Sequence, residues 1–521
     1  MLAHQVWVHP DDWGRWRRSR ALVDRAQTNA RRGLGVDLSR GHLPDRLRPC
    51  ILRVPHSVQA VRSRTGGDLG CRCLGGARPG CWQCGGRSMP VAGDYECFSD
   101  DWRRTSPDLV LFLPKEPPHF VEAVDHILVD VTPGGDLLAV WTYGARPDAS
   151  DQTVLYARSE DGGRTWTDPG QFDPPGPQYG QVACFGFPVI SRTGRIYVFY
   201  NKATAAGTNY TTSFLRCSYS DDDGRSWVPG NVDIPYRRSL LSHPDPSVGT
   251  NALVWQKPIR DARDRLLVGY TEWSSLAAGR PLVVRKPDGT AKIFNSECRC
   301  GFMRFDNIDE GPEPRDVQIT WLPDGNELIS VPITTDPDAP ADLSFCQEPA
   351  VALLPDDRLF TVMRTRNGQI WYTVSDDHGH SWRPTEMLRY SDGASPLENP
   401  VSPTPLFRLR DGRYLQFLQN HDGWGHGAAG PTDSTRTRRP QFISVGEFRP
   451  AAHQPIWFSE PKFLFDTDGV GVPPFYRPWL SMYASLTEHN GERVLWYSDR
   501  KMFGLGRFIT DEILAGMTVP S

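Results

Sequence analysis

From about residue 120 onward, the sequence is a succession of short apolar runs separated by turn-forming residues. Three runs alternate apolar and polar side chains, at residues 154–158, 213–219 and 370–374. A period of two residues is typical of β-strands that bury one face. Two pairs of apolar runs precede the first two of these strands, at 127–131 with 137–141 and at 187–190 with 195–200. The pattern therefore predicts small antiparallel sheets joined in series.

An octapeptide follows each alternating run. Its pattern is Ser-x-Asp-x-Gly-x-(Ser/Thr)-Trp, and it occurs at residues 159–166, 220–227 and 375–382. The Gly supplies the positive φ of a hairpin turn, and the Asp and Ser or Thr side chains bond the turn's own backbone. The Trp covers the turn and begins the next strand. This repeat, an Asp box, is predicted to staple a turn and to do no chemistry.

Further stretches of similar size lack the octapeptide and lie at about residues 253–295, 315–345, 404–460 and 478–510. Repeated units of about 40–60 residues have the size of propeller blades. We therefore predict an all-β fold, a six-bladed β-propeller of four-stranded antiparallel blades over residues 116–521. Its last blade could be closed by strands from both ends of the chain.

Residues 1–115 show weak periodicity and are predicted to form an N-terminal extension that could contribute strands to the propeller. A helix could span residues 11–31, because Asp11 or Asp12 would cap it. Residues 63–95 predict an inserted loop rich in Gly, Arg and Cys.

This loop holds four of the eleven cysteines of the chain: Cys71, Cys73, Cys81 and Cys84. Four thiolates around a Gly- and Pro-rich turn could close a tetrahedral zinc site, although the first pair is one residue tighter than the usual spacing. Disulfides or free thiols are the alternatives. Any metal here would be structural, so we expect no cofactor in catalysis.

Composition and charge exclude several classes of protein. Lys and Arg number 58 and Asp and Glu 62, so the formal net charge is −4. A nucleic-acid partner requires a basic surface, and this balance offers none. No apolar run reaches the about 18 residues of a membrane-spanning helix, and the first residues lack the pattern of a signal peptide. We expect a cytoplasmic protein as the chain is written, or a secreted one if a signal was trimmed.

The repeats and the segments between them resemble the sialidase (neuraminidase) superfamily of Asp-box propellers, over about residues 120–510. The resemblance implies a glycoside hydrolase that acts on a terminal acidic sugar. In that family three arginines bind the substrate carboxylate, a Tyr is the nucleophile, a Glu activates it, and an Asp is the acid and base. A guanidinium suits the carboxylate because it binds in a bidentate manner and keeps its charge.

The strongest local match is the segment 347–364, which leads into the third Asp box. The family has a Glu before one strand and an Arg at the end of the next, with a similar separation. By this resemblance Glu348 is the base that activates the Tyr, and Arg364 is one of the three arginines. The alternative is that neither residue belongs to a site, so that Glu348 is a surface carboxylate and Arg364 lies at a blade edge.

The resemblance implies two further site segments. The loop 141–151 corresponds to one that carries an Arg and then the acid/base Asp, so Arg146 and Asp151 take these roles, with Asp148 as the second choice. Residues 437–443 match the position of another of the three arginines that bind the substrate carboxylate, and Arg439 is preferred over Arg438.

The nucleophile is expected in the closing blade. Residues 481–488 resemble the family's Tyr segment, which makes Tyr483 the candidate and Tyr497 its competitor. Asp499 could replace the supporting carboxylate that the family often has beside Tyr497.

The sequence departs from the family at the first of the three arginines that bind the substrate carboxylate. That place reads Val124-Asp125-His126-Ile127-Leu128 and has no Arg. His126 could take the place of this Arg in the substrate site. Arg53 could instead reach that place if the Cys-rich segment is an insertion in the first blade. Without this Arg the carboxylate-binding set is incomplete, which would suit a different acidic sugar or a neutral one.

The expected function is therefore an exo-acting, retaining glycoside hydrolase of sialidase type, with a glycan substrate that ends in a nonulosonic or related acidic sugar. Two other classes remain. The chain could be a propeller glycosidase or lyase for an arabinan or uronic-acid substrate, or a carbohydrate-binding propeller without turnover.

Overall fold

The computed structural model divides the chain into two compact units, Met1–Gly86 and Arg87–Ser521. The described residues all lie in the second unit. They are 101–114, 123–144, 152–172, 182–203, 212–278, 280, 283–285, 291–293, 297–472 and 476–521. No helix among them is long and apolar enough to cross a membrane.

Antiparallel sheets of short strands make up the fold. The first sheet runs in chain order through four strands: β2 (Ala123–Val131), β3 (Leu137–Gly144), β4 (Thr153–Ser159) and β5 (Gly170–Gln171). β2 and β3 are buried on both faces. The apolar pairs expected at 127–131 with 137–141 and at 187–190 with 195–200 are confirmed as paired strands.

The next sheet is the largest and has nine strands. Its members are β6 (Ala183–Ile190), β7 (Ile196–Ala203), β8 (Thr212–Ser220), β9 (Val228–Pro229), β10 (Thr250–Val254), β11 (Ile259–Arg260), β12 (Leu266–Trp273), β15 (Cys298–Phe305) and β16 (Ile319–Leu322). Only two residue pairs, Thr250 with Ser213 and Asn251 with Thr212, join β10 to β8. A separate two-stranded ribbon consists of β13 (Val283–Arg285) and β14 (Ala291–Ile293).

Three more sheets complete the described strands. One contains β17 (Gln347–Leu353), β18 (Leu359–Arg364), β19 (Trp371–Ser375) and β20 (Glu386–Met387). A five-stranded sheet contains β21 (Leu406–Arg408), β22 (Tyr414–Leu418), β23 (Gln441–Phe448), β24 (Ile456–Phe458) and β25 (Lys462–Phe465). The last contains β26 (Leu480–His489), β27 (Glu492–Asp499), β28 (Phe503–Phe508) and β1 (Leu109–Phe112).

The last sheet joins the two ends of the described chain. β1 pairs with β28, so a strand from the first residues of the described chain lies beside a strand from its end. The short segments η2 (Asp101–Thr105) and α3 (Asp511–Leu514) flank it. The closure that the sequence left open is therefore present.

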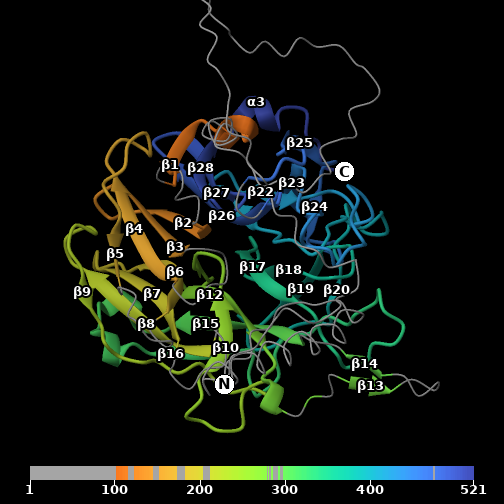
Figure 1. The fold of residues 1–521 in the computed structure, drawn as a ribbon, viewed down its shortest axis with the longest axis horizontal. Helices are drawn as coiled ribbons and strands as arrows, with labels where there is room; N and C mark the ends of the chain where they lie inside the picture. Colours follow the sequence, from red (N-terminus) through yellow and green to blue (C-terminus); the bar gives the residue numbers. More distant parts are fainter. Residues whose placement is uncertain are drawn as a thin grey trace, which may run out of the picture. The chain divides into compact units, whose positions relative to one another are not determined.

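Packing between sheets gives a propeller-like arrangement. β26 packs on β2, β2 on β6, β6 on β10, β12 on β17, and β17 on β21. The sheets of β22 and β27 share a buried core that includes Phe417, Ile443, Leu480 and Tyr497. Figure 1 shows β2, β6, β17 and β26 facing a common centre. Strands buried on both faces follow from this arrangement, because each sheet lies between two others.

The predicted count of six blades is not confirmed by the strand pairing. Four sheets of four or five strands are blade-like, and the remaining strands form the continuous nine-stranded sheet and the ribbon. The separate unit expected at 315–345 is wrong, because β16 pairs with β15 inside the nine-stranded sheet.

Each Asp box forms the predicted turn. In the third box, Ser375 Oγ donates to Asp377 Oδ1, and the backbone N–H of Ser381 donates to the same oxygen, both at 2.8 Å. Gly379 has a φ of 92° and donates its N–H to Ser375 Oγ at 2.8 Å. Trp382 stacks on Phe302, with ring centroids 4.8 Å apart. The box thus closes a turn and ties it to the neighbouring sheet.

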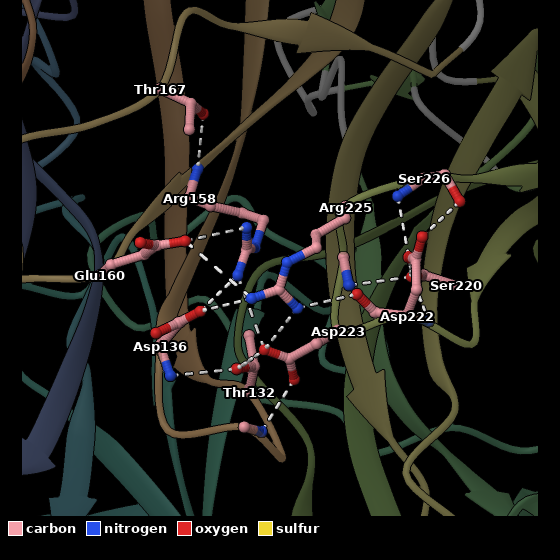
Figure 2. A network of polar contacts seen from close by, with 12 residues as sticks. Thr132, Asp136, Arg158, Glu160, Thr167, Ser220, Asp222, Asp223, Arg225 and Ser226 are labelled. Atoms are coloured by element: carbon pink, nitrogen blue, oxygen red, sulfur yellow. Dashed lines mark hydrogen bonds and ion pairs between the residues drawn. The ribbon is translucent and has the colours of Figure 1, made fainter.

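A charged network links the first box to the second (Figure 2). Arg158, at the end of β4, pairs with Asp136 and lies 3.6 Å from Asp223 of the second box. Arg225 lies 3.6 Å from Asp136 and 3.8 Å from Asp223. Two arginines and two aspartates therefore hold the outer ends of neighbouring sheets together. Pairs of this kind at a surface each contribute about 0–1 kcal/mol.

Several sequence expectations lie outside the described residues. These are the helix at 11–31, the Cys-rich loop with Cys71, Cys73, Cys81 and Cys84, Arg53, Arg146, Asp148 and Asp151.

Candidate active site

Backbone bulges aim side chains from the first strands of several sheets toward the common centre. His126 in β2, Phe185 in β6 and Glu348 in β17 have φ values of 57°, 54° and 56°. Each lies where the strand register shifts. Left-handed backbone in residues other than Gly is costly and persists where the surrounding structure enforces it. A Thr of the preceding sheet supports two of the bulges, because Thr142 Oγ1 accepts from the N–H of Phe185 and Thr271 Oγ1 from that of Glu348, both at 2.7 Å.

Tyr483 lies at a corresponding irregularity of β26, between Ser481 and Ser485. Its side chain is buried, with 3% of the residue exposed. The phenol ring stacks on Trp255, with centroids 4.7 Å apart and planes 23° from parallel. An apolar face thus holds the ring, and the hydroxyl group is left to polar neighbours.

Arg364, at the end of β18, joins Tyr483 to Glu348. Its Nη1 donates to Glu348 Oε1 at 2.5 Å and to Tyr483 Oη at 3.4 Å. Glu348 Oε2 has no hydrogen-bond partner among the described residues. Burial alone would lower the pKa of Arg364, but the Glu348 carboxylate raises it above its ordinary value. The structure therefore brings together a phenol, a carboxylate and a guanidinium that the sequence had assigned to one site.

A second guanidinium reaches the same phenol. Arg438 Nη1 donates to Tyr483 Oη at 3.4 Å, and its side chain is buried. The carbonyl of Arg438 accepts from the N–H of Leu480 at 2.8 Å, which ties the segment before β23 to the start of β26. Burial lowers the pKa of Arg438 below its ordinary value. Two buried cations thus converge on one hydroxyl.

Arg439, the arginine preferred from the sequence, contacts a carboxylate and an imidazole in this geometry. Arg439 Nε donates to Asp466 Oδ1 at 2.8 Å, and its Nη1 contacts His426 Nδ1 at 3.2 Å. Of these two neighbours, the arginine that donates to Tyr483 in the structure is Arg438. The sequence alone does not say which of the two arginines does so.

His126, the residue expected at the place of the first arginine, lies among aromatic rings. The residue is fully buried, and its ring lies 5.4 Å from the ring of Phe185 and 6.0 Å from that of Trp255. Burial lowers the pKa of His126 to about 3. The imidazole is therefore neutral near pH 7, and the place of His126 in the substrate site stays a prediction.

Lys501 supplies the third positive charge, and the sequence analysis missed it. Its Nζ lies 5.0 Å from the centroid of the Tyr483 ring and donates to Asp125 Oδ2 at 2.7 Å. Only 5% of Lys501 and 1% of Asp125 is exposed. No spacing rule points to Lys501, because it lies in the turn after β27.

That turn has an unusual sequence for its geometry. Arg500 and Lys501 have φ values of 53° and 56°, and the N–H of Met502 donates to the carbonyl of Asp499 at 3.0 Å. A two-residue turn with two positive φ values usually contains Asn and Gly. Each bulky residue here costs roughly 1–2 kcal/mol. Arg500 offsets part of this cost through ion pairs with Asp499 and Asp101.

Tyr497, the competitor for the role of nucleophile, is placed elsewhere. Its hydroxyl group lies 2.8 Å from Thr105 Oγ1, and its ring stacks on Phe465 at 4.7 Å. Burial raises the pKa of Tyr497 far above its ordinary value. Asp499 is engaged by Arg500 through two contacts of 2.8 Å. Both residues belong to the closure of the last sheet.

The remaining candidates lie outside the described residues: Arg146, Asp151 and the four cysteines of the proposed zinc site. Within the described residues, no group of three or more His, Cys, Asp or Glu side chains could hold a metal ion. The described part of the site therefore consists of Tyr483, Glu348, Arg364, Arg438 and the pair of Lys501 with Asp125, which we call the Tyr483 cluster.

The family model of BNR repeat-like domains matches residues 135–438, more than half of the chain. No curated protein matches the sequence. Among solved structures, the chain is similar to the Hadza microbial sialidase Hz136, with 18% identity and a TM-score of 0.47, over 74% of this chain and 66% of that one.

Two further structures are similar to the chain. One is the intramolecular trans-sialidase from Ruminococcus gnavus in complex with oseltamivir carboxylate, with 14% identity and a TM-score of 0.47, over 76% of this chain and 96% of that one. The other is the Trypanosoma rangeli sialidase, with 10% identity and a TM-score of 0.44, over 76% of this chain and 56% of that one. The matches span less than two thirds of Hz136 and of the Trypanosoma rangeli sialidase.

Proposed function

The chain belongs to the family of BNR repeat-like domains, and from this premise we propose that it is a glycoside hydrolase of sialidase type that removes a terminal acidic sugar. One observation carries the proposal. Arg364 Nη1 contacts both Glu348 Oε1 and Tyr483 Oη, and Arg438 contacts the same phenol, although these residues come from four different strands or strand ends. A cluster with this composition matches the chemistry of a carboxylate-bearing sugar.

The argument starts from charge. A sugar with a carboxylate on its anomeric carbon repels an attacking carboxylate, and sialidases use a Tyr nucleophile instead. Two guanidinium groups beside Tyr483 favour both the bound carboxylate and the developing phenolate. The buried setting strengthens these interactions because little water competes there.

In the proposed first step, the Tyr483 oxygen bonds to the anomeric carbon while the bond from that carbon to the leaving oxygen breaks. The phenol proton passes to Glu348, whose Oε2 has no hydrogen-bond partner among the described residues. The leaving oxygen takes a proton from Asp151. This assignment of Asp151, with Arg146 as a substrate contact in the same loop, rests on the sequence resemblance.

In the second step, water attacks the anomeric carbon and the bond to Tyr483 breaks. Asp151 accepts a proton from the water, and the phenolate recovers its proton from Glu348. Two displacements at one carbon retain its configuration. Arg364 and Arg438 hold the substrate carboxylate throughout, by bidentate hydrogen bonds of the kind that guanidinium forms.

We also propose that the propeller has six blades. The nine-stranded sheet is joined at β8 and β10 by only two residue pairs, so it divides naturally into two blades of about four strands. With the other four sheets, this division gives six. The boundary between the N-terminal extension and the propeller is proposed at about residue 115, with β1 contributed by the extension.

The test is turnover of fluorogenic glycosides by the purified protein, with Tyr483→Phe and Asp151→Asn variants beside it. The panel contains N-acetylneuraminic acid, its deaminated analogue, an octulosonic acid, a glucuronide and an arabinofuranoside. We expect release from an ulosonic sugar and a loss of at least about a thousandfold in Tyr483→Phe, since removal of a nucleophile abolishes the covalent route. Full activity of Tyr483→Phe would contradict the mechanism. Activity confined to the neutral sugar would contradict the substrate class.

A further inference from the structure

The ion pair of Lys501 with Asp125 lies where two sheets meet, and Lys501 belongs to a turn and not to a strand. Asp125 belongs to β2 and Lys501 to the turn after β27, so the pair joins two neighbouring sheets. The N–H of Val124 already donates to the carbonyl of Lys501 at 2.9 Å and makes the same connection through the backbone. The ammonium group is therefore not needed merely to hold these strands together.

Burial makes the pair expensive. The side chains of Lys501 and Asp125 have 6% and 2% of their surface exposed. The cost of taking two charges out of water often exceeds the attraction between them. The backbone of Lys501 is also left-handed, with a φ of 56°. Strained backbone and costly buried charge at one residue favour a functional role over a structural one.

The surroundings of the ammonium group show which role is available. Its Nζ lies 5.0 Å from the Tyr483 ring and 5.4 Å from the Trp479 ring. Arg438 also lies beside Trp479, with its guanidinium carbon 5.7 Å from that ring. The two cations thus flank the aromatic pair Trp479 and Tyr483, and Arg364 completes a set of three.

We propose that Lys501 is the third cation of the ligand site and that the site binds a sugar through its carboxylate by contacts with Arg364, Arg438 and Lys501. This inference rests on the proposed function, because it names the substrate class of the same site. Asp125 is a positioning residue, since it holds the ammonium group toward Tyr483.

The test separates recognition of the carboxylate from a structural effect. Each of three acids, N-acetylneuraminic acid, its deaminated analogue and an octulosonic acid, is titrated calorimetrically beside its neutral methyl ester. The variant is Lys501→Gln, whose amide can still donate to Asp125 but carries no charge. The matched control is Lys257→Gln, because Lys257 pairs with Asp130 of the same strand β2 at 3.1 Å and lies outside the Tyr483 cluster.

We expect the wild-type protein to bind at least one acid about tenfold more tightly than its ester. Lys501→Gln should reduce this preference to within about threefold, and Lys257→Gln should leave it unchanged. Equal weakening of acid and ester, or no weakening, would overturn the inference, because a structural role affects both ligands alike. If inorganic phosphate binds as tightly as the acid, the site recognises a simple oxyanion and the sugar part is overturned.

The two proposals can fail separately. If Lys501→Gln leaves turnover of an acidic glycoside unaffected and acid and ester bind equally, the proposed role of Lys501 is wrong and the proposed hydrolase function stands. If acid binding depends on Lys501 but no glycoside is turned over, the proposed hydrolase function is wrong and the proposed role of Lys501 in binding stands. If wild-type protein binds none of the acids, both proposals are wrong.

A measurement on the wild-type protein covers the case in which Lys501→Gln does not fold. Hydrogen exchange of the turn 499–502 is followed with saturating acid and with its ester. The acid should slow exchange there more than the ester, because it contacts the ammonium group of this turn. Equal protection by both ligands would overturn the inference.

Discussion

In the third Asp box, Asp377 finds its partners Ser375 and Ser381 within four residues along the chain. In the Tyr483 cluster, the arginines that donate to the Tyr483 hydroxyl lie 45 and 119 residues away, at Arg438 and Arg364. The box lies in a turn whose carboxylate is largely satisfied by local donors. The cluster is buried and brings the cationic side chains Arg364, Arg438 and Lys501 together.

The difference separates two uses of the same side chains. Local hydrogen bonds fix a turn, whatever the rest of the chain does, and they leave little capacity for a ligand. A cluster assembled from distant strands exists only in the folded protein, and its polar atoms are incompletely paired, as Glu348 Oε2 shows among the described residues. Buried groups of this kind are costly and mark functional sites. Stability and activity should therefore respond to different carboxylates.

The largest effect is expected for Glu348→Gln. The amide cannot accept the phenol proton as a carboxylate does, so turnover should fall by roughly a hundredfold to ten-thousandfold. The matched control is Glu297→Gln, because Glu297 is equally buried and pairs with Arg280 and Arg299 outside the cluster. The measurement is kcat with thermal unfolding beside it. Equal losses of kcat in both variants would contradict the separation of the two uses.

A smaller effect is expected for Arg438, one of the two arginines that contact Tyr483. Arg438→Met should lower kcat/KM by about tenfold to a hundredfold, the value of one hydrogen bond to a charged group. Arg439→Met removes the pair with Asp466 and should cost much less activity. Steady-state kinetics of the two variants decides between the neighbours. A larger loss in Arg439→Met would restore the assignment made from the sequence.

For the boxes, the expected effect falls on stability alone. Asp377→Ala removes the acceptor of hydrogen bonds from Ser375 and Ser381 and should lower the free energy of unfolding by about 1–3 kcal/mol. Thermal unfolding measures the loss, and kcat per folded molecule should not change. A variant with wild-type stability and reduced kcat would show that the box acts on the site.

The smallest effect is a dependence of stability on pH. Hydrogen bonds from Thr165 lower the pKa of Asp161 to about 2, and those from Ser226 do the same for Asp222. These carboxylates therefore stabilise the fold fully above about pH 4, and the stabilisation is lost as pH falls toward 2. Melting temperatures between pH 5 and pH 2 should fall less steeply in Asp161→Asn with Asp222→Asn. Parallel curves would contradict the lowered pKa values.

The same contrast explains what could be predicted from the sequence. The Asp boxes were predictable because the hydrogen bonds that close each turn lie within eight residues. Glu348 and Arg364 were assigned through the family resemblance of segment 347–364, and they contact each other because they lie on paired strands of one hairpin.

Other features depend on packing between sheets, which spacing does not report. Arg438 and Arg439 are neighbours in sequence, and only the fixed start of β26 selects the one that faces Tyr483. Lys501 was missed because its turn lacks the Asn and Gly that such turns usually contain. The lowered pKa of His126 depends on burial that no local pattern shows.

The closure of the last sheet also has a consequence for synthesis. Asp108 at the start of β1 bonds to Phe508 at the end of β28, 400 residues later. At roughly 5–20 residues per second, a ribosome needs about 20–80 s to deliver the partner of β1. Until then the strand Leu-Val-Leu-Phe has no edge on which to pair. A nascent chain of this protein is therefore exposed at this strand for its whole translation, and this is the place where we expect a chaperone to bind first.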